Sequence, residues 1–263
     1  MKRIAQITVI FAMLLSLTGL ALAGGQGGEP TGEKVVKIGC SVSMSGKMAP
    51  EGTNVKRGVE LWEEFVNSKG GIKVGNDMYQ VEVVYYDDKS DAGTGTKLTE
   101  KLITEDKVDF LFGPFSSGIT FATTAIGEKY DVITVAPEAN ATQVYERGYK
   151  NVFSILPPAP FLTQPIFDMI DELDLSPEPK TVAIIVSNDL FPLSCAEGAL
   201  EKCEELGLEV VLYEKYPADT TDVSALLSQV KDKNPDIFLT SGYTKDALMV
   251  VRQSREINLS ADV

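Results

Sequence analysis

The 263-residue chain contains no histidine. This absence excludes catalysis by a Ser-His-Asp triad or a Cys-His pair, and it excludes every metal site that needs an imidazole ligand. The G-x-S-x-G turn of serine hydrolases is also missing, because GPFSSG at 113–118 has a different spacing. We therefore expect a protein that is not an enzyme and that carries no metal or other cofactor.

Cysteines and basic residues are scarce as well. The three cysteines are Cys40, Cys195 and Cys203, and the last two lie on one expected helix. At the rise of a helix they are ~12 Å apart, whereas a disulfide needs Cα atoms within ~7 Å. We expect buried free thiols rather than a disulfide framework. The formal net charge of −14 leaves no electrostatic basis for binding nucleic acid or anionic lipid.

The N-terminus combines basic residues, an apolar run and a small-residue A-x-A triplet at 21–23. This order predicts an export signal over residues 1–23, followed by a flexible Gly-rich lead-in over 24–33. The apolar run is also close to the ~20 residues needed to span a bilayer, so an uncleaved membrane anchor is the alternative. Both interpretations place the protein in the periplasm or at the extracellular face of the membrane.

From Val35 onward, short apolar runs alternate with longer amphipathic segments. Apolar runs without alternation are typical of strands covered on both faces, which predicts a parallel sheet with helices on each side. Prolines interrupt the series near 151–158, and a second series follows. We expect two doubly wound, Rossmann-like α/β lobes, residues 34–156 and 157–263, joined by a hinge at that point. The second lobe has three expected strands and no return segment, so it looks incomplete.

Ligands of open α/β sheets bind beyond the carboxyl ends of the strands. The loops expected there are rich in hydroxyls and amides and poor in lysine and arginine, which favours a small polar, zwitterionic or amide ligand. Ser116 and Ser117 follow an apolar strand and a Gly-Pro turn, directly before a predicted helix. They could simply cap that helix, or they could hold a ligand carboxylate together with its free NH groups.

Other polar and aromatic residues follow neighbouring strands. The loop APEANAT (136–142) could complete the same site. Tyr243 could reach across a cleft between the lobes or lie on the surface, and Phe191 could cover an apolar ligand group or pack in the core. The pair Asp87-Asp88 could serve acid-base or metal chemistry, but a solvated turn at the strand end is the preferred interpretation.

Five stretches, taken in order, carry a resemblance to a known family: VVKIGCSVSMSGKMAPEGTNVKRGVELWEEFVNSKGGI, VEVVYYDDKSD, LFGPFSSGIT, APEANAT and TSGYTKDALMVVRQSREINL. Together they resemble the leucine/isoleucine/valine-binding proteins, which are type I periplasmic binding proteins. The resemblance implies an extracytoplasmic solute-binding protein of an ABC transporter. Such a protein binds a small amino acid or related amide between its lobes and delivers it to a membrane permease and its ATPase. A ligand-sensing receptor or regulatory domain of the same fold is the alternative.

The resemblance also implies ligand-binding roles for particular residues. Ser117 matches the serine that binds the ligand α-carboxylate, and Ser116 lies beside it. Asn140 stands where the family usually has a threonine that contacts carboxylate and ammonium. Tyr243 and Phe191 match second-lobe aromatic residues, of which the tyrosine closes over the ligand.

Departures from the family pattern concern the end of the ligand that lies away from its carboxylate. Glu138 replaces a small residue whose carbonyl faces the ammonium, and Glu51 stands where branched-chain binders tend to have an aromatic residue. These changes favour a ligand that is more polar than a branched aliphatic amino acid. The family's acidic partner for the ammonium lies beyond Val263. The predicted ligand-binding residues are Ser116, Ser117, Glu138, Ala139, Asn140, Phe191 and Tyr243, and Glu51 is set apart because it departs from the pattern.

Overall fold

The computed structural model describes residues 34–173 and 177–261. The predicted export signal (1–23) and lead-in (24–33) lie outside these residues. Within the described ranges, no helix is both long enough and apolar enough to cross a membrane.

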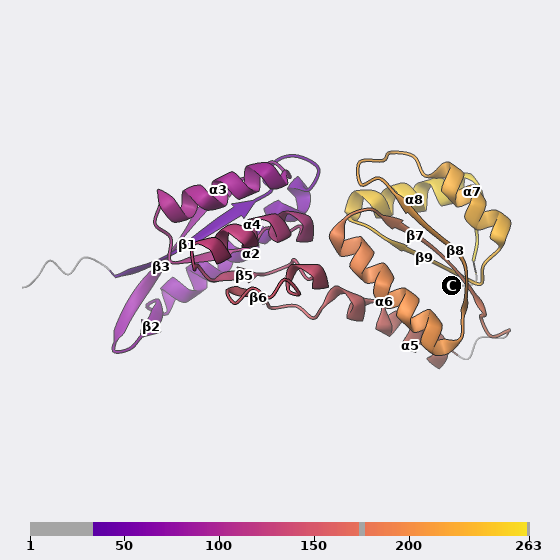
Figure 1. Ribbon diagram of the computed structural model, residues 1–263, viewed down its shortest axis with the longest axis horizontal. Helices are drawn as coiled ribbons and strands as arrows, with labels where there is room; N and C mark the ends of the chain where they lie inside the picture. The colour runs from indigo at the N-terminus through magenta and orange to yellow at the C-terminus, as the bar shows by residue number, and fades with distance from the viewer. Residues whose placement is uncertain (1–33, 174–176, 262–263) are drawn as a thin grey trace, which may run out of the picture. The chain divides into compact units, whose positions relative to one another are not determined.

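The first sheet contains six strands in the order β2-β3-β1-β4-β5-β6 (Figure 1). All neighbouring pairs are parallel except β2 and β3, which form an antiparallel hairpin at one edge. The hairpin turns at Gly75, whose positive φ of 63° suits a tight turn, and the sequence had not predicted strand β2. The strands are β1 (Val35–Val42), β2 (Ile72–Val74), β3 (Asp77–Asp87), β4 (Phe110–Phe112), β5 (Thr134–Ala136) and β6 (Val152–Ser154).

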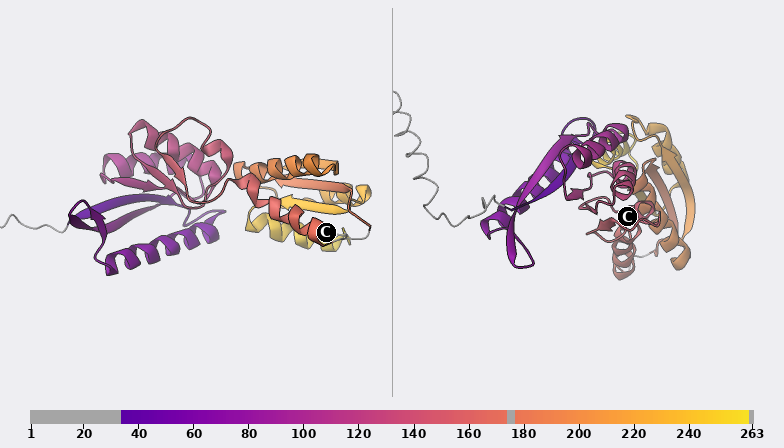
Figure 2. Two further views of the ribbon diagram at one scale, coloured as in Figure 1. Left: turned by 90° about the horizontal axis from the view of Figure 1, so that it is seen from below. Right: turned by 60° about the vertical axis from the view of Figure 1, so that its left-hand side comes forward.

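Helices cover both faces of this sheet, as the unbroken apolar strands predict. Figure 2 shows α2 (Ala49–Ser68) on one side and α3 (Ala92–Thr104) and α4 (Ser117–Lys129) on the other. Val55 and Val59 of α2 pack on the buried side chains of β1 and β3, with Trp62 at the margin of this cluster. The opposite face buries a smaller cluster that includes Leu102, Val108 and Leu111.

A second, fully parallel sheet has the order β8-β7-β9. Its strands are β7 (Thr181–Ser187), β8 (Glu209–Tyr216) and β9 (Ile237–Ser241), and its helices are α5 (Gln164–Glu172), α6 (Leu190–Leu206), α7 (Ser224–Lys233) and α8 (Thr244–Glu256). One cluster, around Phe167 and Ile184, packs on α5 and α6, and another, around Ile185 and Leu227, packs on α7 and α8. The two expected series of strands and helices are therefore present. The lobe boundary between residues 156 and 157 remains a prediction.

The chain reaches the second sheet through a short 3-10 helix, η2 (Ala159–Leu162), which follows the proline cluster. This segment packs so tightly on α6 that a Cβ added at Gly198 would lie 2.3 Å from the carbonyl oxygen of Pro160. The hydroxyl of Ser194, also on α6, accepts a hydrogen bond from the backbone NH of Thr142 at 3.3 Å. By these and other contacts, the described residues from Val35 onward form one compact unit.

The three cysteines are free and buried, as predicted. Burial raises the pKa of the Cys40 thiol to about 12. Burial likewise raises the pKa values of Cys195 and Cys203 to about 11 each.

The Asp87-Asp88 pair anchors the loop that leads from β1 into α2. Asp88 is 0% exposed and accepts hydrogen bonds from the Ser43 hydroxyl at 2.6 Å and from the Ser90 backbone NH at 2.8 Å. Asp87 accepts the hydroxyl of Ser45 at 2.6 Å and two backbone NH groups of the same loop. The predicted solvated turn is wrong for Asp88, because hydroxyls distant in sequence replace the water around its carboxylate.

Candidate functional site

Ser116 and Ser117 have different tasks at the start of α4, although they are adjacent and each 1% exposed. Ser116 is the N-cap, and its Oγ accepts a hydrogen bond from the Ile119 backbone NH at 3.4 Å. The Oγ of Ser117 accepts a hydrogen bond from the Ala141 backbone NH at 3.3 Å. The cap interpretation therefore describes Ser116, whereas Ser117 ties the helix to the loop after β5.

Asn140 holds that loop against the crossing to the second sheet. Its Nδ2 donates to the Pro157 carbonyl at 2.9 Å, and its backbone carbonyl accepts from the Ala159 NH at 2.8 Å. Because the Pro157 carbonyl can only accept, its hydrogen bond with Nδ2 fixes the orientation of the Asn140 side-chain amide and places Oδ1 on the opposite side. Asn140 is 1% exposed, and its Oδ1 has no hydrogen-bond partner in the described part of the chain. The neighbouring carbonyl of Ala139 accepts the Tyr145 hydroxyl.

Tyr243 lies between two other aromatic rings. Its ring centroid is 5.6 Å from that of Phe115 and 5.8 Å from that of Phe191, on which it stacks. Its hydroxyl is buried and makes no hydrogen bond of good geometry with the described residues. Burial raises the pKa of Tyr243, and the nearby Ser116 hydroxyl offsets only part of this effect. The two predicted aromatic residues therefore meet, and Phe115, which the sequence had not singled out, joins them from the first lobe.

These side chains enclose a cavity of about 140 Å³. Ser117, Glu138, Asn140, Phe191 and Tyr243 line it, as predicted, whereas Ser116 and Ala139 are not part of its wall. The remaining lining residues are Phe115, Leu156 and Leu162. Whether these residues bind a ligand remains a prediction, but five of the seven candidates surround one space.

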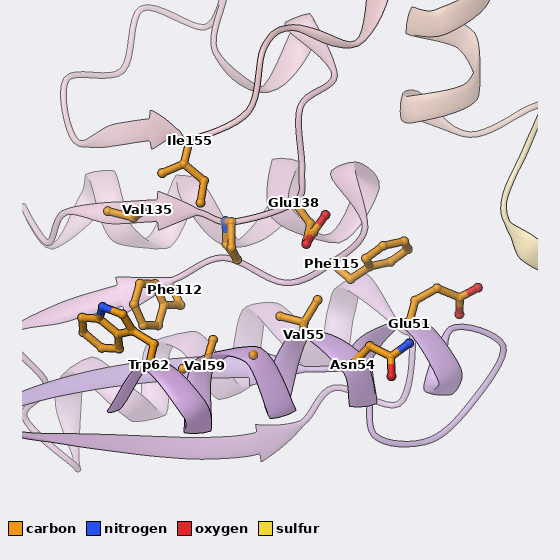
Figure 3. A pocket seen from close by; sticks show the side chains of 12 residues that line it. Glu51, Asn54, Val55, Val59, Trp62, Phe112, Phe115, Val135, Glu138 and Ile155 are labelled. Atoms are coloured by element: carbon orange, nitrogen blue, oxygen red, sulfur yellow. The ribbon is translucent and has the colours of Figure 1, made fainter. Parts of the chain in front are cut away.

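A larger cavity of about 600 Å³ adjoins the small one, because Phe115 and Glu138 belong to both walls. Figure 3 shows Trp62 and Phe112 at one end and Glu51 and Asn54 at the other. Glu51 therefore lies in this adjoining cavity and not in the small one. The remaining residues that line the larger cavity are Val55, Gly58, Val59, Val135, Pro137 and Ile155. The sequence had not revealed this cavity, because segments far apart in the chain form its walls.

Acidic groups dominate the polar part of this region. Partial burial raises the pKa of the Glu138 carboxyl, and no positively charged group among the described residues lowers it again. No group of His, Cys, Asp and Glu side chains in the described ranges has the arrangement of a metal site. The side chains that line the two cavities offer hydrogen bonds, charge and aromatic contact.

Replacing Glu138 with Gln should raise the melting temperature slightly once the pH is above the pKa of the folded carboxyl. The raised pKa means that the folded protein holds the Glu138 proton more tightly than the unfolded chain does. The stability contribution of this group is therefore present in acid and is lost as the pH rises through the folded pKa. Thermal unfolding at several pH values tests this, with exposed Glu64→Gln as control. An equal rise in the melting temperature of Glu138→Gln at acidic pH would contradict this prediction.

Comparisons with known proteins give a consistent result. The profile of a family described as periplasmic binding protein matches residues 35–263. Leu/Ile/Val-binding protein homolog 7 of Brucella abortus is 28% identical over 245 residues, which are 91% of this chain and 60% of the relative. The chain thus spans about 60% of the length of this curated relative.

Solved structures show the same likeness. The branched-chain amino acid transporter substrate-binding protein LivJ of Streptococcus pneumoniae, in complex with isoleucine, superposes with a TM-score of 0.74 at 27% identity. That match covers 87% of this chain and 63% of LivJ. An ABC transporter solute-binding protein of R. palustris, in complex with benzoate, gives a TM-score of 0.73 at 25% identity, over 86% of this chain and 61% of that protein.

Proposed function

Because the chain belongs to the periplasmic binding protein family, we propose that it is an exported solute-binding protein of an ABC transporter. Its relatives are substrate-binding proteins for amino acids and aromatic acids. In this proposal the protein binds a small amino acid or related amide in the cavity of about 140 Å³ and delivers it to a membrane permease and its ATPase. The observation that carries the proposal is the convergence of five predicted ligand residues on that cavity.

The start of α4 supplies the binding site for a ligand carboxylate. The free NH groups of the first turn carry about half a positive charge, which favours an anion. Ser117 lines the cavity, and its Oγ already accepts the NH of Ala141. Its own O–H therefore remains available to donate to the carboxylate.

Aromatic rings from the second lobe cover the other side of the ligand. Tyr243 begins α8 and Phe191 lies in the first turn of α6, so both rings are carried by the helix starts of that lobe. Closure on the ligand is a hinge motion near residues 151–158, stabilised by contacts that both lobes make only in the closed state.

Titration calorimetry of the native protein with amino acids, amides and benzoate tests the proposed function. We expect Ser117→Ala to weaken the carboxylate ligand about tenfold, because one hydrogen bond to a charged group is lost. Ser254→Ala is the matched control, since its buried Oγ makes no hydrogen bond with the described residues. Absence of binding by every member of the panel would overturn the substrate class.

A further inference from the structure

Each of the two cavities has in its wall one residue with a buried acceptor oxygen that lacks a donor among the described residues, Glu51 in the larger and Asn140 in the smaller. The Oε2 of Glu51 is buried and makes no hydrogen bond with any residue that the structure describes. The Oδ1 of Asn140 is in the same situation, and its orientation is fixed by the bond from Nδ2 to Pro157. Glu138, an exposed residue, lines both cavities. Buried acceptors without partners are unfavourable, so this region is suited to a molecule that brings donors.

Among the described residues, no lysine or arginine forms an ion pair with Glu51 or Glu138. Among the described residues that line the cavity of about 600 Å³, none is a lysine or an arginine. Of the cations near the start of α2, Lys47 lies 4.0 Å from Asp189 and Lys56 pairs with Glu60.

Glu51 also borders a second surface cavity, whose wall includes Lys47, Lys245 and Arg252. None of these three cations forms an ion pair with Glu51 in the described part of the chain. The Glu51 carboxylate therefore borders three cations but forms an ion pair with none of them in the described part of the chain.

We propose that Glu51 and Glu138 form a subsite for a cationic, hydrogen-bond-donating group of the ligand, an ammonium or a guanidinium. This inference rests on the proposed function, and it narrows the ligand to a basic amino acid. The carboxylate of the ligand binds at Ser117, and its cationic side chain extends past Phe115 toward Glu51. The ring of Phe115 lies in both walls and favours a cation by its quadrupole. An amide could satisfy the acceptors but would leave both carboxylates without a counter-charge.

Paired ligands of nearly equal shape isolate the charge in the test. The native protein is titrated with lysine and norleucine, with arginine and citrulline, and with isoleucine and benzoate. We expect the cationic member of at least one pair to bind about tenfold or more tighter than its neutral counterpart. Tighter binding of the neutral member in both pairs would overturn the subsite.

Conservative variants then locate the effect. Glu51→Gln and Glu138→Gln should each reduce the ratio of cationic to neutral affinity about tenfold, while the neutral member changes little. Glu64→Gln, on the exposed face of α2, should leave the ratio unchanged. A ratio that is unaffected by either glutamine variant would place the cation elsewhere and overturn the assignment.

The outcomes separate this inference from the proposed function. If isoleucine or benzoate binds with an affinity that depends on Ser117, and the cationic ligands do not bind, the subsite is wrong and the proposed function stands. If no ligand of the panel binds, both are wrong. Circular dichroism of each variant confirms that it is folded before its affinities are compared.

Discussion

Replacing Gly52 with alanine should lower the free energy of unfolding by about 3 kcal/mol, although alanine is the better helix former. A Cβ at this position would lie 2.1 Å from the carbonyl oxygen of Ser43 and 2.8 Å from its carbon. Both are backbone atoms of a loop that Asp87 and Asp88 hold in place, so the clash cannot be relieved by a side-chain rotation. The first turn of α2 would have to move away, and Glu51 would move with it.

The same helix offers a matched control. A Cβ at Gly58 would meet nothing within 4 Å, so Gly58→Ala should raise stability by up to about 1 kcal/mol through helix propensity alone. Urea unfolding of both variants measures the difference. Equal stability of the two alanine variants would contradict the close packing of α2 on the loop after β1.

Replacing Asp88 with alanine should cost about 3 kcal/mol of stability, because buried donors lose the carboxylate that accepts from them. The Ser43 hydroxyl and the Ser90 backbone NH both donate to Oδ1, and the Ser41 hydroxyl lies 3.4 Å from Oδ2. Asp88→Asn should lose less than about 1 kcal/mol, since an amide oxygen can replace Oδ1. Urea unfolding of the two variants measures both values.

The pH dependence of the Asp88 variants provides a second readout. Burial raises the pKa of Asp88, and the hydrogen bonds from Ser43 and Ser90 reverse only part of that effect. The folded state therefore favours the protonated acid, and the cost of its charge grows as the pH rises through the folded pKa. Relative to wild type, Asp88→Asn should accordingly be least stable in acid. Equal stability of the alanine variant and wild type would show that the buried carboxylate contributes nothing.

The sequence was most informative about elements that depend on local chemistry. Apolar runs predicted the parallel strands, and the Gly-Pro turn with Ser116 predicted the start of α4, because strand packing and helix capping act over short distances. The burial of Asp88 could not be read in this way. The burial of its carboxylate depends on a hydrogen bond from Ser43, which lies 45 positions earlier in the chain. Such distant partners decide whether a polar turn is exposed to solvent.

The candidate site was predictable in part for the same reason. Strand ends located Ser117, Asn140 and Tyr243, since the carboxyl ends of parallel strands lie at one edge of each sheet. The different hydrogen bonds of Ser116 and Ser117 follow from tertiary contacts and were not visible in a pair of adjacent serines. Phe115 was overlooked because a single aromatic residue beside a Gly-Pro turn has no distinctive pattern.

The burial of all three thiols makes the protein suitable for conversion into an optical reporter. With pKa values of about 11 to 12, Cys40, Cys195 and Cys203 carry almost no thiolate at neutral pH, and thiolate is the form that reacts with maleimide dyes. A cysteine introduced in place of Leu156, which is 37% exposed and lines the small cavity, would therefore be labelled selectively. If the proposed function holds, a polarity-sensitive fluorophore at that position would report solute binding without removal of any native cysteine.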